Sequence, residues 1–342
     1  SDAPPYQSGV SRLVGLLKDG LEKSGHRVTL VHPKFRVKEL KFSSIPFRQY
    51  SNSYDLIHLH GPTPLLSDLT LLTHRKCPIV YTHHAEVCWI SRRISKLYTR
   101  FHRFLAKKAQ AIIVHSRDYK SLFKGANVTV LHLPCSFKRP QKFDIERKSN
   151  RFTVLFVGQF RPFKGIDVLL KTASMLSNVD FVLVGDGYLK PKCMRMAEGL
   201  ENVSFLGKVN DDALERLYAQ AHVVCLPSVN TTEAYGLVLI EGALYGCVPV
   251  ASDLMGVQEN VSRLHGCLFT PRSPHSLAEK IKMLSSKRDL WLNLANRSRR
   301  AAHDYVSMYP AEYYVRKHEE IFANVCSQKN TNCGQKVYVT NG

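Results

Sequence analysis

The chain has 342 residues, a net charge of +20 and 44% apolar residues, values that predict a globular protein of two domains. No apolar run approaches the ~20 residues of a membrane-spanning helix, and the first residues lack the basic and apolar segments of a signal peptide. Nine scattered cysteines without a Cys-x-x-Cys pair predict free thiols in a reducing compartment, the cytoplasm, and argue against a zinc site.

The positive charge is concentrated in the first half of the chain. Residues 1–150 hold 26 Lys and Arg against 10 Asp and Glu, whereas residues 151–342 hold 22 against 18. A basic field of this kind attracts anionic partners, among them nucleic acids, phospholipid surfaces and phosphorylated substrates.

The first predicted element is a helix that begins at residue 9, because apolar residues follow at helical spacing as far as Leu21. A strand is predicted directly after it, at 28–32. A helix in this position implies a preceding strand, and the pattern contains none, so we expect either that the chain is truncated at its N-terminus or that its first strand was not captured. Gly9 either lets a ligand phosphate or an acceptor approach closely or is an ordinary helix cap.

Histidines end two predicted buried strands. His60 comes at the end of the strand that starts at Asp55, and His83 and His84 end the strand that starts at Pro78. Open α/β sheets bind their ligands at this edge. The histidine spacing is not that of a metal site, so we expect roles in hydrogen bonding or in acid/base chemistry.

Residues 89–108 predict a basic amphipathic helix with seven Lys and Arg. Two interpretations are open and compatible. In one, the apolar stripe packs into the domain core and the charged face is solvated. In the other, the helix contacts an anionic membrane surface. The stripe consists of Ile90, Ile94, Leu97, Phe101 and Leu105.

Strands and helices alternate along the whole chain, and a polar, charged segment at 136–150 predicts a linker. This alternation predicts parallel sheets. We therefore expect an α/β protein with two doubly wound, Rossmann-like domains that face a cleft. The predicted boundaries are 1–148 for the first domain, 149–305 for the second, 306–326 for a final helix and 327–342 for a loose tail.

Glu233 and Glu241 lie eight residues apart around the predicted start of a helix. Glu233 follows a buried strand and Glu241 lies about a turn and a half into the helix, a span of at most ~12 Å. A helix N-terminus at a sheet edge favours phosphate. The two carboxylates could therefore hold hydroxyls at either end of a nucleotide sugar. The alternative is a pair of solvated glutamates on a helix face.

Several short motifs occur in the order and spacing found in one enzyme family. With them the chain resembles the retaining glycosyltransferases of family 4, which have the GT-B fold. Glu233 to Glu241 fits the E-x7-E motif of that family. The others are a glycine-rich loop with a lysine at 158–165, landmarks at 184–187 and 205–207, the strand end at 80–84 and the loop at 5–9.

The resemblance implies a role for each matching residue. Lys164 would neutralise the donor diphosphate, Glu241 would bind the ribose, and Glu233 and His84 would contact the sugar, which makes Lys164, Glu233 and His84 the catalytic candidates. Arg161 would replace the cation that the family has at the position of Gln159. The other implied donor-binding residues are Gly9, Gly185, Asp186, Val209, Ala234, Tyr235, Gly236 and Leu237.

The resemblance also implies the reaction and its partners. The second domain would bind a nucleotide-diphosphate sugar carrying a hexose-type sugar, and the first would bind an acceptor hydroxyl. The last helix would cross back to the first domain. No metal or other cofactor would be required. A lipid-linked or membrane-associated acceptor would account for the basic first half and for a peripheral location on the inner membrane face.

Two alternatives remain from the residues themselves. A GT-B epimerase acting on a nucleotide sugar would keep the nucleotide contacts but need its own acid and base across the cleft. A basic nucleic-acid-binding protein would need a recognition helix or aromatic sheet faces, and helix 89–108 is the sole candidate. We therefore expect no nucleic acid among the partners.

Overall fold

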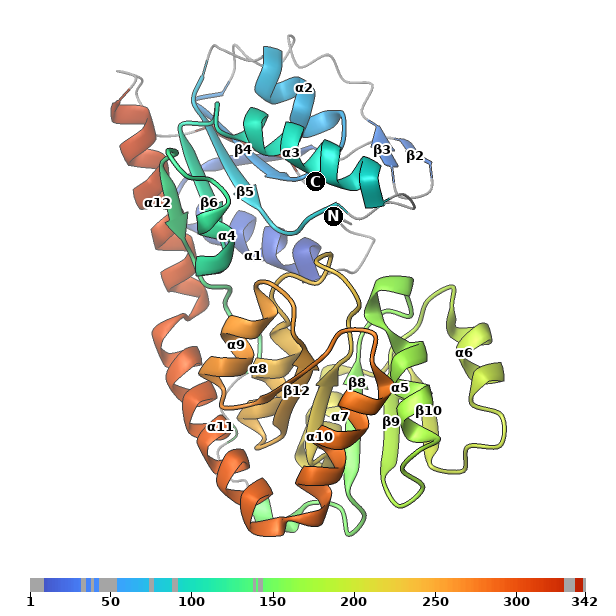
Figure 1. The fold of residues 1–342 in the computed structure, drawn as a ribbon. Coiled ribbons are helices and arrows are strands. Elements are labelled where there is room, and N and C mark those ends of the chain that lie inside the picture. The colour runs from blue at the N-terminus through green and yellow to red at the C-terminus, as the bar shows by residue number, and fades with distance from the viewer. Residues whose placement is uncertain are drawn as a thin grey trace. The chain divides into compact units, whose positions relative to one another are not determined.

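The structure, a computed structural model, describes residues 9–31, 35–37, 40–42, 54–73, 77–87, 92–137, 140, 144–328 and 336–340. The chain forms two compact units, which are drawn together in Figure 1. Unit 1 contains residues 1–134 and 309–342, and unit 2 contains residues 135–308. Each unit has a six-stranded sheet with connecting helices, so the prediction of two doubly wound α/β domains is confirmed.

Unit 1 is built on a parallel sheet in the order β1-β14-β4-β5-β6-β7. Its central strands β4, β5 and β6 are buried along their whole length, as expected of strands covered on both faces. A separate hairpin pairs β2 (Phe35–Val37) with β3 (Leu40–Phe42). The sheet strands are β1 (Arg27–Val31), β4 (Leu56–Gly61), β5 (Ile79–His83), β6 (Ala111–Val114), β7 (Val128–Val130) and β14 (Lys336–Thr340).

Strand β14 corrects one prediction, because the segment expected to be a loose tail contains a strand that lies between β1 and β4 in the sheet. β14 pairs in parallel with both β1 and β4. Val337 and Val339 are buried there. Their β-branched side chains suit an interior strand.

The helices of unit 1 include two that pack closely on each other, α1 (Gly9–Lys23) and α12 (Ala311–Ser327). A Cβ atom at Gly20 would clash with the side chain of Val315, so the glycine permits the close approach. α12 thus belongs to unit 1. The remaining helices are α2 (Leu66–Thr73), α3 (Arg92–Ala106) and α4 (Arg117–Ser121).

Cysteine chemistry differs in one place from the expectation of free thiols. Six of the described cysteines are free. Cys326, near the end of α12, is disulfide-bonded. The Cys326 side chain is buried.

Unit 2 is built on a second parallel sheet, in the order β10-β9-β8-β11-β12-β13. The chain leaves β8 toward one side of the sheet and continues from β11 toward the other, so the topological switch point lies between β8 and β11. The strands are β8 (Thr153–Val157), β9 (Asp180–Val184), β10 (Val203–Gly207), β11 (Val223–Leu226), β12 (Val248–Ser252) and β13 (Cys267–Phe269).

The helices of unit 2 enclose an apolar core that runs through β8, β9, β11 and β12. In Figure 1 they surround the sheet, with α8, α9 and α11 beside β12. The helices are η2 (Ile145–Arg147), η3 (Pro162–Lys164), α5 (Ile166–Ala173), α6 (Lys190–Met196), α7 (Asp211–Gln220), α8 (Leu237–Leu244), α9 (Val257–Arg263), α10 (Pro274–Ser286) and α11 (Arg288–Met308).

The units divide after Pro134 and after Met308, not after residues 148 and 305 as the polar segment suggested. Described parts of that segment pack on unit 2. Phe137 meets Tyr218 edge to face. The Lys148 side chain is buried, and its Nζ donates to the carbonyl oxygens of Ala221, at 2.5 Å, and Tyr245, at 2.8 Å. Lys148 therefore anchors this segment to unit 2, because its ammonium group donates hydrogen bonds to carbonyl oxygens near the ends of α7 and α8.

Candidate active site

Two residues of opposite charge meet at the switch point of unit 2. Lys164 lies in the loop after β8, and Glu233 lies in the loop after β11, the neighbouring strand. The Lys164 Nζ donates to the Glu233 Oε2 at 2.5 Å, and the two side chains are 15% and 12% exposed. Ser228 Oγ approaches the same oxygen at 3.4 Å. The structure therefore brings together two of the three predicted catalytic residues.

The two loops are held against each other through the backbone. Gly165 has φ 64° and precedes α5. A Cβ atom there would lie 1.9 Å from the carbonyl oxygen of Pro227 in the β11 loop. The amide of Val229 in turn donates to the carbonyl of Phe163 at 2.8 Å. Because a side chain at 165 would drive the loops apart, the glycine sets the distance between Lys164 and Glu233.

The Glu233 loop is further fixed from α9 and α11. Asn260 of α9 donates to the Tyr235 carbonyl at 2.8 Å, and the Tyr235 and Tyr305 hydroxyls lie 2.5 Å apart. Tyr235 and Ala234 are buried, so the Tyr235 side chain anchors the loop. Gly236 has φ 74° and precedes α8, which begins at Leu237. These residues place the N-terminal amides of α8 directly after Glu233.

Glu241 lies inside α8 and has a partner that the sequence did not indicate. Its Oε2 accepts a hydrogen bond of 2.9 Å from the hydroxyl of Tyr218 in α7, and its carboxylate is largely buried. Burial and the neighbouring carboxylate raise the pKa of Tyr218 well above its usual value, so the phenol remains a donor. Tyr218 therefore holds the second acidic residue of the motif in place. In the sequence, the only signal for this role of Tyr218 was its position on the inner face of a helix.

Four further predicted residues lie on this edge of unit 2. Asp186 follows β9 and is exposed, and its carboxylate accepts from the amide of Gly187 at 2.8 Å. Gly185 has φ 128°, and a Cβ there would lie 1.9 Å from the Gly158 carbonyl oxygen. Arg161 precedes η3 and Val209 follows β10, both partly exposed. Their roles toward a donor stay predictions.

Unit 1 carries its candidate residues on the corresponding edge of its own sheet. Gly9 is exposed at the start of α1, whereas Pro5 and Ser8 of the same motif lie outside the described residues. His84 follows β5 and is partly exposed. Its Nε2 lies 2.8 Å from His60 Nδ1, and its Nδ1 lies 3.3 Å from His115 Nε2. Sequence reasoning identified His60 and His84 but not His115, which comes directly after β6.

Burial governs the protonation of these histidines. It lowers the pKa of His60 and of His84 well below the usual value, and the nearby imidazoles lower them further. It lowers the pKa of His115 to about 3. The three rings are therefore neutral at physiological pH.

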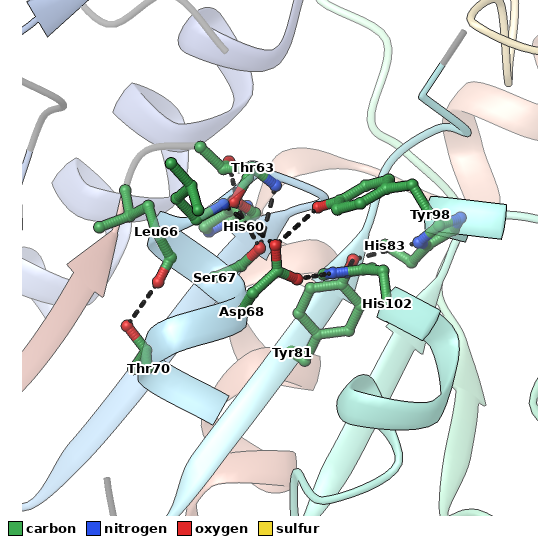
Figure 2. A network of polar contacts seen from close by, with 11 residues as sticks. His60, Thr63, Leu66, Ser67, Asp68, Thr70, Tyr81, His83, Tyr98 and His102 are labelled. Atoms are coloured by element: carbon green, nitrogen blue, oxygen red, sulfur yellow. Dashed lines mark hydrogen bonds and ion pairs between the residues drawn. The ribbon is translucent and has the colours of Figure 1, made fainter. Parts of the chain in front are cut away.

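A second buried network lies behind this edge, and Figure 2 shows most of it. Asp68 of α2 accepts from His102 Nδ1 at 2.5 Å and from the Tyr98 hydroxyl at 2.9 Å, both on α3. The Tyr81 hydroxyl lies 2.8 Å from His102 Nε2 and 3.1 Å from His83 Nδ1. Although burial opposes it, the bond to His102 and its charge lower the pKa of Asp68. The network ties α2 and α3 to β5.

The network continues from His83 to the surface through Glu86. His83 Nε2 lies 3.5 Å from Glu86 Oε1, and Arg103 of α3 donates to the same oxygen at 2.6 Å. Burial raises the pKa of Glu86, but His83 and Arg103 more than reverse this and lower it to about 2. Glu86 is therefore ionised and fixes one end of α3.

Helix α3 corrects the prediction of a buried apolar stripe. Of the stripe residues, Leu105 is buried, but Leu97 is 73% exposed and Ile94 and Phe101 are exposed as well. The buried face of the helix is instead formed by Ser95, His102, Leu105 and Ala106. His102, on that face, is satisfied by the Asp68 network, which is why a face with little apolar character can be buried.

In the described ranges, no group of three or more His, Cys, Asp and Glu residues is arranged to hold a metal ion. Within the same ranges, no helix is long and apolar enough to cross a membrane.

Two protein-family models match this chain, one in each unit. The model of Glycosyltransferase Family 4 matches residues 7–133, and that of Glycosyl transferases group 1 matches residues 137–303. The O-antigen chain mannosyltransferase C of Escherichia coli is 28% identical over 328 residues, which cover 89% of this chain and 85% of that protein.

Solved structures share the fold at low sequence identity. The sucrose-phosphate synthase of Thermosynechococcus elongatus superposes with a TM-score of 0.74 at 18% identity, covering 94% of each chain. The Anabaena protein HepE, solved with UDP-glucose, superposes with a TM-score of 0.70 at 19% identity, covering 94% of this chain and 98% of that one. These likenesses concern the fold alone.

Proposed function

The chain belongs to family 4 of the glycosyltransferases and has their GT-B fold, and from this premise we propose a specific reaction for it. Unit 2 binds a nucleotide-diphosphate sugar, and the enzyme moves a hexose-type sugar from it to an acceptor hydroxyl with retention of anomeric configuration. The observation that carries the proposal is the contact between Lys164 and Glu233 across the switch point.

The two charges are well suited to the two halves of such a donor. Ligands of open α/β sheets bind at the switch point, and there a diphosphate would attract Lys164 away from its carboxylate partner. Glu233, thus released, would accept hydrogen bonds from the sugar hydroxyls. The first amides of α8 would add partial positive charge beside the phosphate. Glu241, held by Tyr218, would accept from the ribose.

In the reaction the bond between the anomeric carbon and the diphosphate breaks, and the diphosphate leaves as an anion. Lys164 stabilises the negative charge that develops on it, which is the main electrostatic task of the site. Retention would follow a front-face route, in which the acceptor hydroxyl attacks from the side of the leaving group and passes its proton to the departing phosphate. No step requires a metal ion or another cofactor.

The test compares Glu233→Gln with wild-type enzyme at saturating donor. The amide keeps the size of the side chain but removes its charge, so transfer should fall at least a hundredfold while the melting temperature stays within a few degrees. Arg161→Gln is the matched control on the same edge and should lose less. Full turnover by Glu233→Gln would refute the proposal, as would inactivation by EDTA that Mn²⁺ reverses.

We propose further that the acceptor is presented on an anionic membrane surface, the inner face of the membrane, where the protein would be peripheral. Support comes from α3, which has four exposed apolar side chains: Ile94, Leu97, Phe101 and Phe104. The same helix carries exposed basic residues that would meet anionic headgroups. They are Arg93, Lys96 and Arg100, and the exposed Lys107 and Lys108 directly follow the end of the helix.

Cosedimentation with vesicles of phosphatidylcholine and phosphatidylglycerol tests the membrane proposal. Wild-type protein should bind at low salt, and the double variant Leu97→Ser/Phe104→Ser should bind about tenfold more weakly, as expected from the loss of two exposed apolar groups. Met194→Ser, at an exposed position of α6, is the control. Equal binding of all three proteins, or a dimer that only the double variant loses, would contradict it.

The sugar is proposed from a relative. The E. coli protein is named a mannosyltransferase, so GDP-mannose is the first donor to try, with UDP-glucose, which is bound in the HepE structure, as the second. An epimerase would turn over the donor without any acceptor, and a nucleic-acid-binding protein would retard RNA or DNA at moderate salt. Neither alternative is favoured by the comparisons.

A further inference from the structure

Three histidines of unit 1 form a continuous hydrogen-bonded chain across the carboxyl ends of three neighbouring strands. His60 ends β4, His84 follows β5 and His115 follows β6. The rings of His60 and His84 are nearly parallel, with 14° between their planes. The chain ends at His115, whose Nδ1 lies 2.9 Å from the carbonyl oxygen of Leu131.

The last contact decides where every proton of the chain lies. A carbonyl oxygen can only accept, so His115 Nδ1 carries the proton. In a neutral imidazole the other nitrogen is then an acceptor, so His84 Nδ1 must donate to His115 Nε2. By the same rule His84 Nε2 accepts from His60 Nδ1. Three neutral rings thus supply three protons to three hydrogen bonds.

This arrangement resists a fourth proton. An imidazolium at His84 would turn its Nε2–H toward His60 Nδ1, so His60 would have to move its own proton from Nδ1 to Nε2 to become an acceptor. The groups that act on the pKa values of this histidine chain include four further histidines, which carry no negative charge: His58 on β4, His83 on β5, His132 after β7 and His318 on α12. Glu86 lies beside His83, but Arg103 pairs with its carboxylate. Burial of the chain acts in the same direction.

We propose that His60 and His115 are positioning residues that hold His84 as a neutral ring with its proton on Nδ1. His84 then serves the transfer as an oriented polar group and does not accept the proton of the acceptor hydroxyl. The inference rests on the proposed function for its catalytic meaning, but the protonation state that it assigns belongs to unit 1 alone.

Nitrogen NMR of the full-length protein, labelled with ¹⁵N at histidine, tests the assignment without any substrate. Long-range ¹H–¹⁵N correlations distinguish the two neutral forms of histidine from the cation. His84, identified by its absence in His84→Gln, should carry its proton on Nδ1 and show no change between pH 8 and pH 5.5. A proton on Nε2, or a cation at pH 6, would overturn the proposal.

Two variants of His115 separate positioning from simple packing. His115→Asn keeps a donor near the Nδ1 position for Leu131 but offers His84 no acceptor, whereas His115→Gln places an amide oxygen near the Nε2 position. With the donor that the transferase assay identifies, His115→Asn should lose about tenfold in kcat, with little change in the KM for the donor. His115→Gln should stay within about twofold of wild type.

Outcomes of the two experiments are distinguishable. Equal losses in both variants, with the NMR spectrum of His84 unchanged, would show that His115 only fills space and would overturn the positioning role. Failure to find any transferase activity would refute the proposed function but would leave the NMR result to decide the protonation of His84. His115→Asn should shift His84 toward the other neutral form in the NMR spectrum whether or not transfer is detected.

Discussion

The ligand edges of the two sheets are built from opposite kinds of polar group. In unit 2 the switch point holds an ion pair, Lys164 with Glu233, and a buried carboxylate, Glu241. In unit 1 the strand ends hold three neutral imidazoles bonded to one another. The first edge offers full charges and the second offers fixed dipoles without net charge.

Under the proposed function, this difference predicts a division of labour in sugar transfer. A diphosphate needs a cation, and a sugar needs carboxylates for its hydroxyls, so charge on the unit 2 edge is useful. An uncharged acceptor hydroxyl needs orientation, which fixed hydrogen-bonding groups can supply. Substitutions that alter each edge separately test this difference.

The largest effect is expected from Gly165→Ala. The new Cβ would meet the Pro227 carbonyl at 1.9 Å and the residue would keep a positive φ, so we expect about 3 kcal/mol of destabilisation and loss of transfer. Gly125→Ala is the matched control, because it too has positive φ but open space around it, and should cost about 1 kcal/mol. Urea unfolding measures both, and equal costs would show that the loop contact is unimportant.

A smaller effect is expected from Tyr218→Phe, which removes a donor to the buried carboxylate of Glu241. A hydrogen bond to a charged group contributes about 1.5–3 kcal/mol, so the variant should unfold at lower urea and its KM for the donor should rise about tenfold. Tyr188→Phe, at an exposed tyrosine of unit 2, should change neither quantity. An unaltered donor KM in Tyr218→Phe would show that Glu241 does not bind the donor.

The smallest effects concern the pH dependence of stability. They distinguish the contribution of the neutral histidines from that of the Glu86 carboxylate. The pKa of His115 is lowered to about 3 in the folded protein, against about 6.5 in the unfolded chain. The unfolded chain therefore binds more protons between these values, and stability is lost as pH falls from 6.5 toward 3. His115→Gln should reduce that slope by about one proton, which urea unfolding between pH 7 and 4.5 measures.

Glu86 acts in a lower and separate pH range. Its folded pKa of about 2 lies below the unfolded value of about 4.3, so its contribution is complete above about pH 5 and is lost as pH falls through about 2. Glu86→Gln should therefore be destabilised by on the order of 2 kcal/mol at pH 7 and by about half as much at pH 3. A destabilisation that does not depend on pH would contradict the shift.

Much of the unit 2 site could be predicted from sequence because its signals are local. Lys164 and Glu233 each follow a predicted strand, and the glycines beside them mark the turns. Their direct contact joins residues that are 69 positions apart, and no local pattern indicates it. The same holds for Tyr218, whose partner lies on another helix, so only the packing of α7 on α8 reveals its role.

The errors in unit 1 have a common physical cause. Helical periodicity shows that α3 has an apolar stripe but not whether that stripe faces the core, and here a polar face is buried because Asp68 and Tyr81 satisfy it. Strand β14 enters the sheet from the far end of the chain. Its place depends on pairing with β1 and β4, which local composition does not encode.

The central claim is that the ion pair at the unit 2 switch point is the donor site. Calorimetric titration of wild-type protein and Lys164→Met with GDP-mannose, UDP-glucose and the corresponding nucleoside diphosphates tests it most directly. At least one nucleotide sugar should bind the wild type, and Lys164→Met should bind it at least tenfold more weakly while remaining folded. Binding of equal strength to both proteins, or none to the wild type, would contradict the claim.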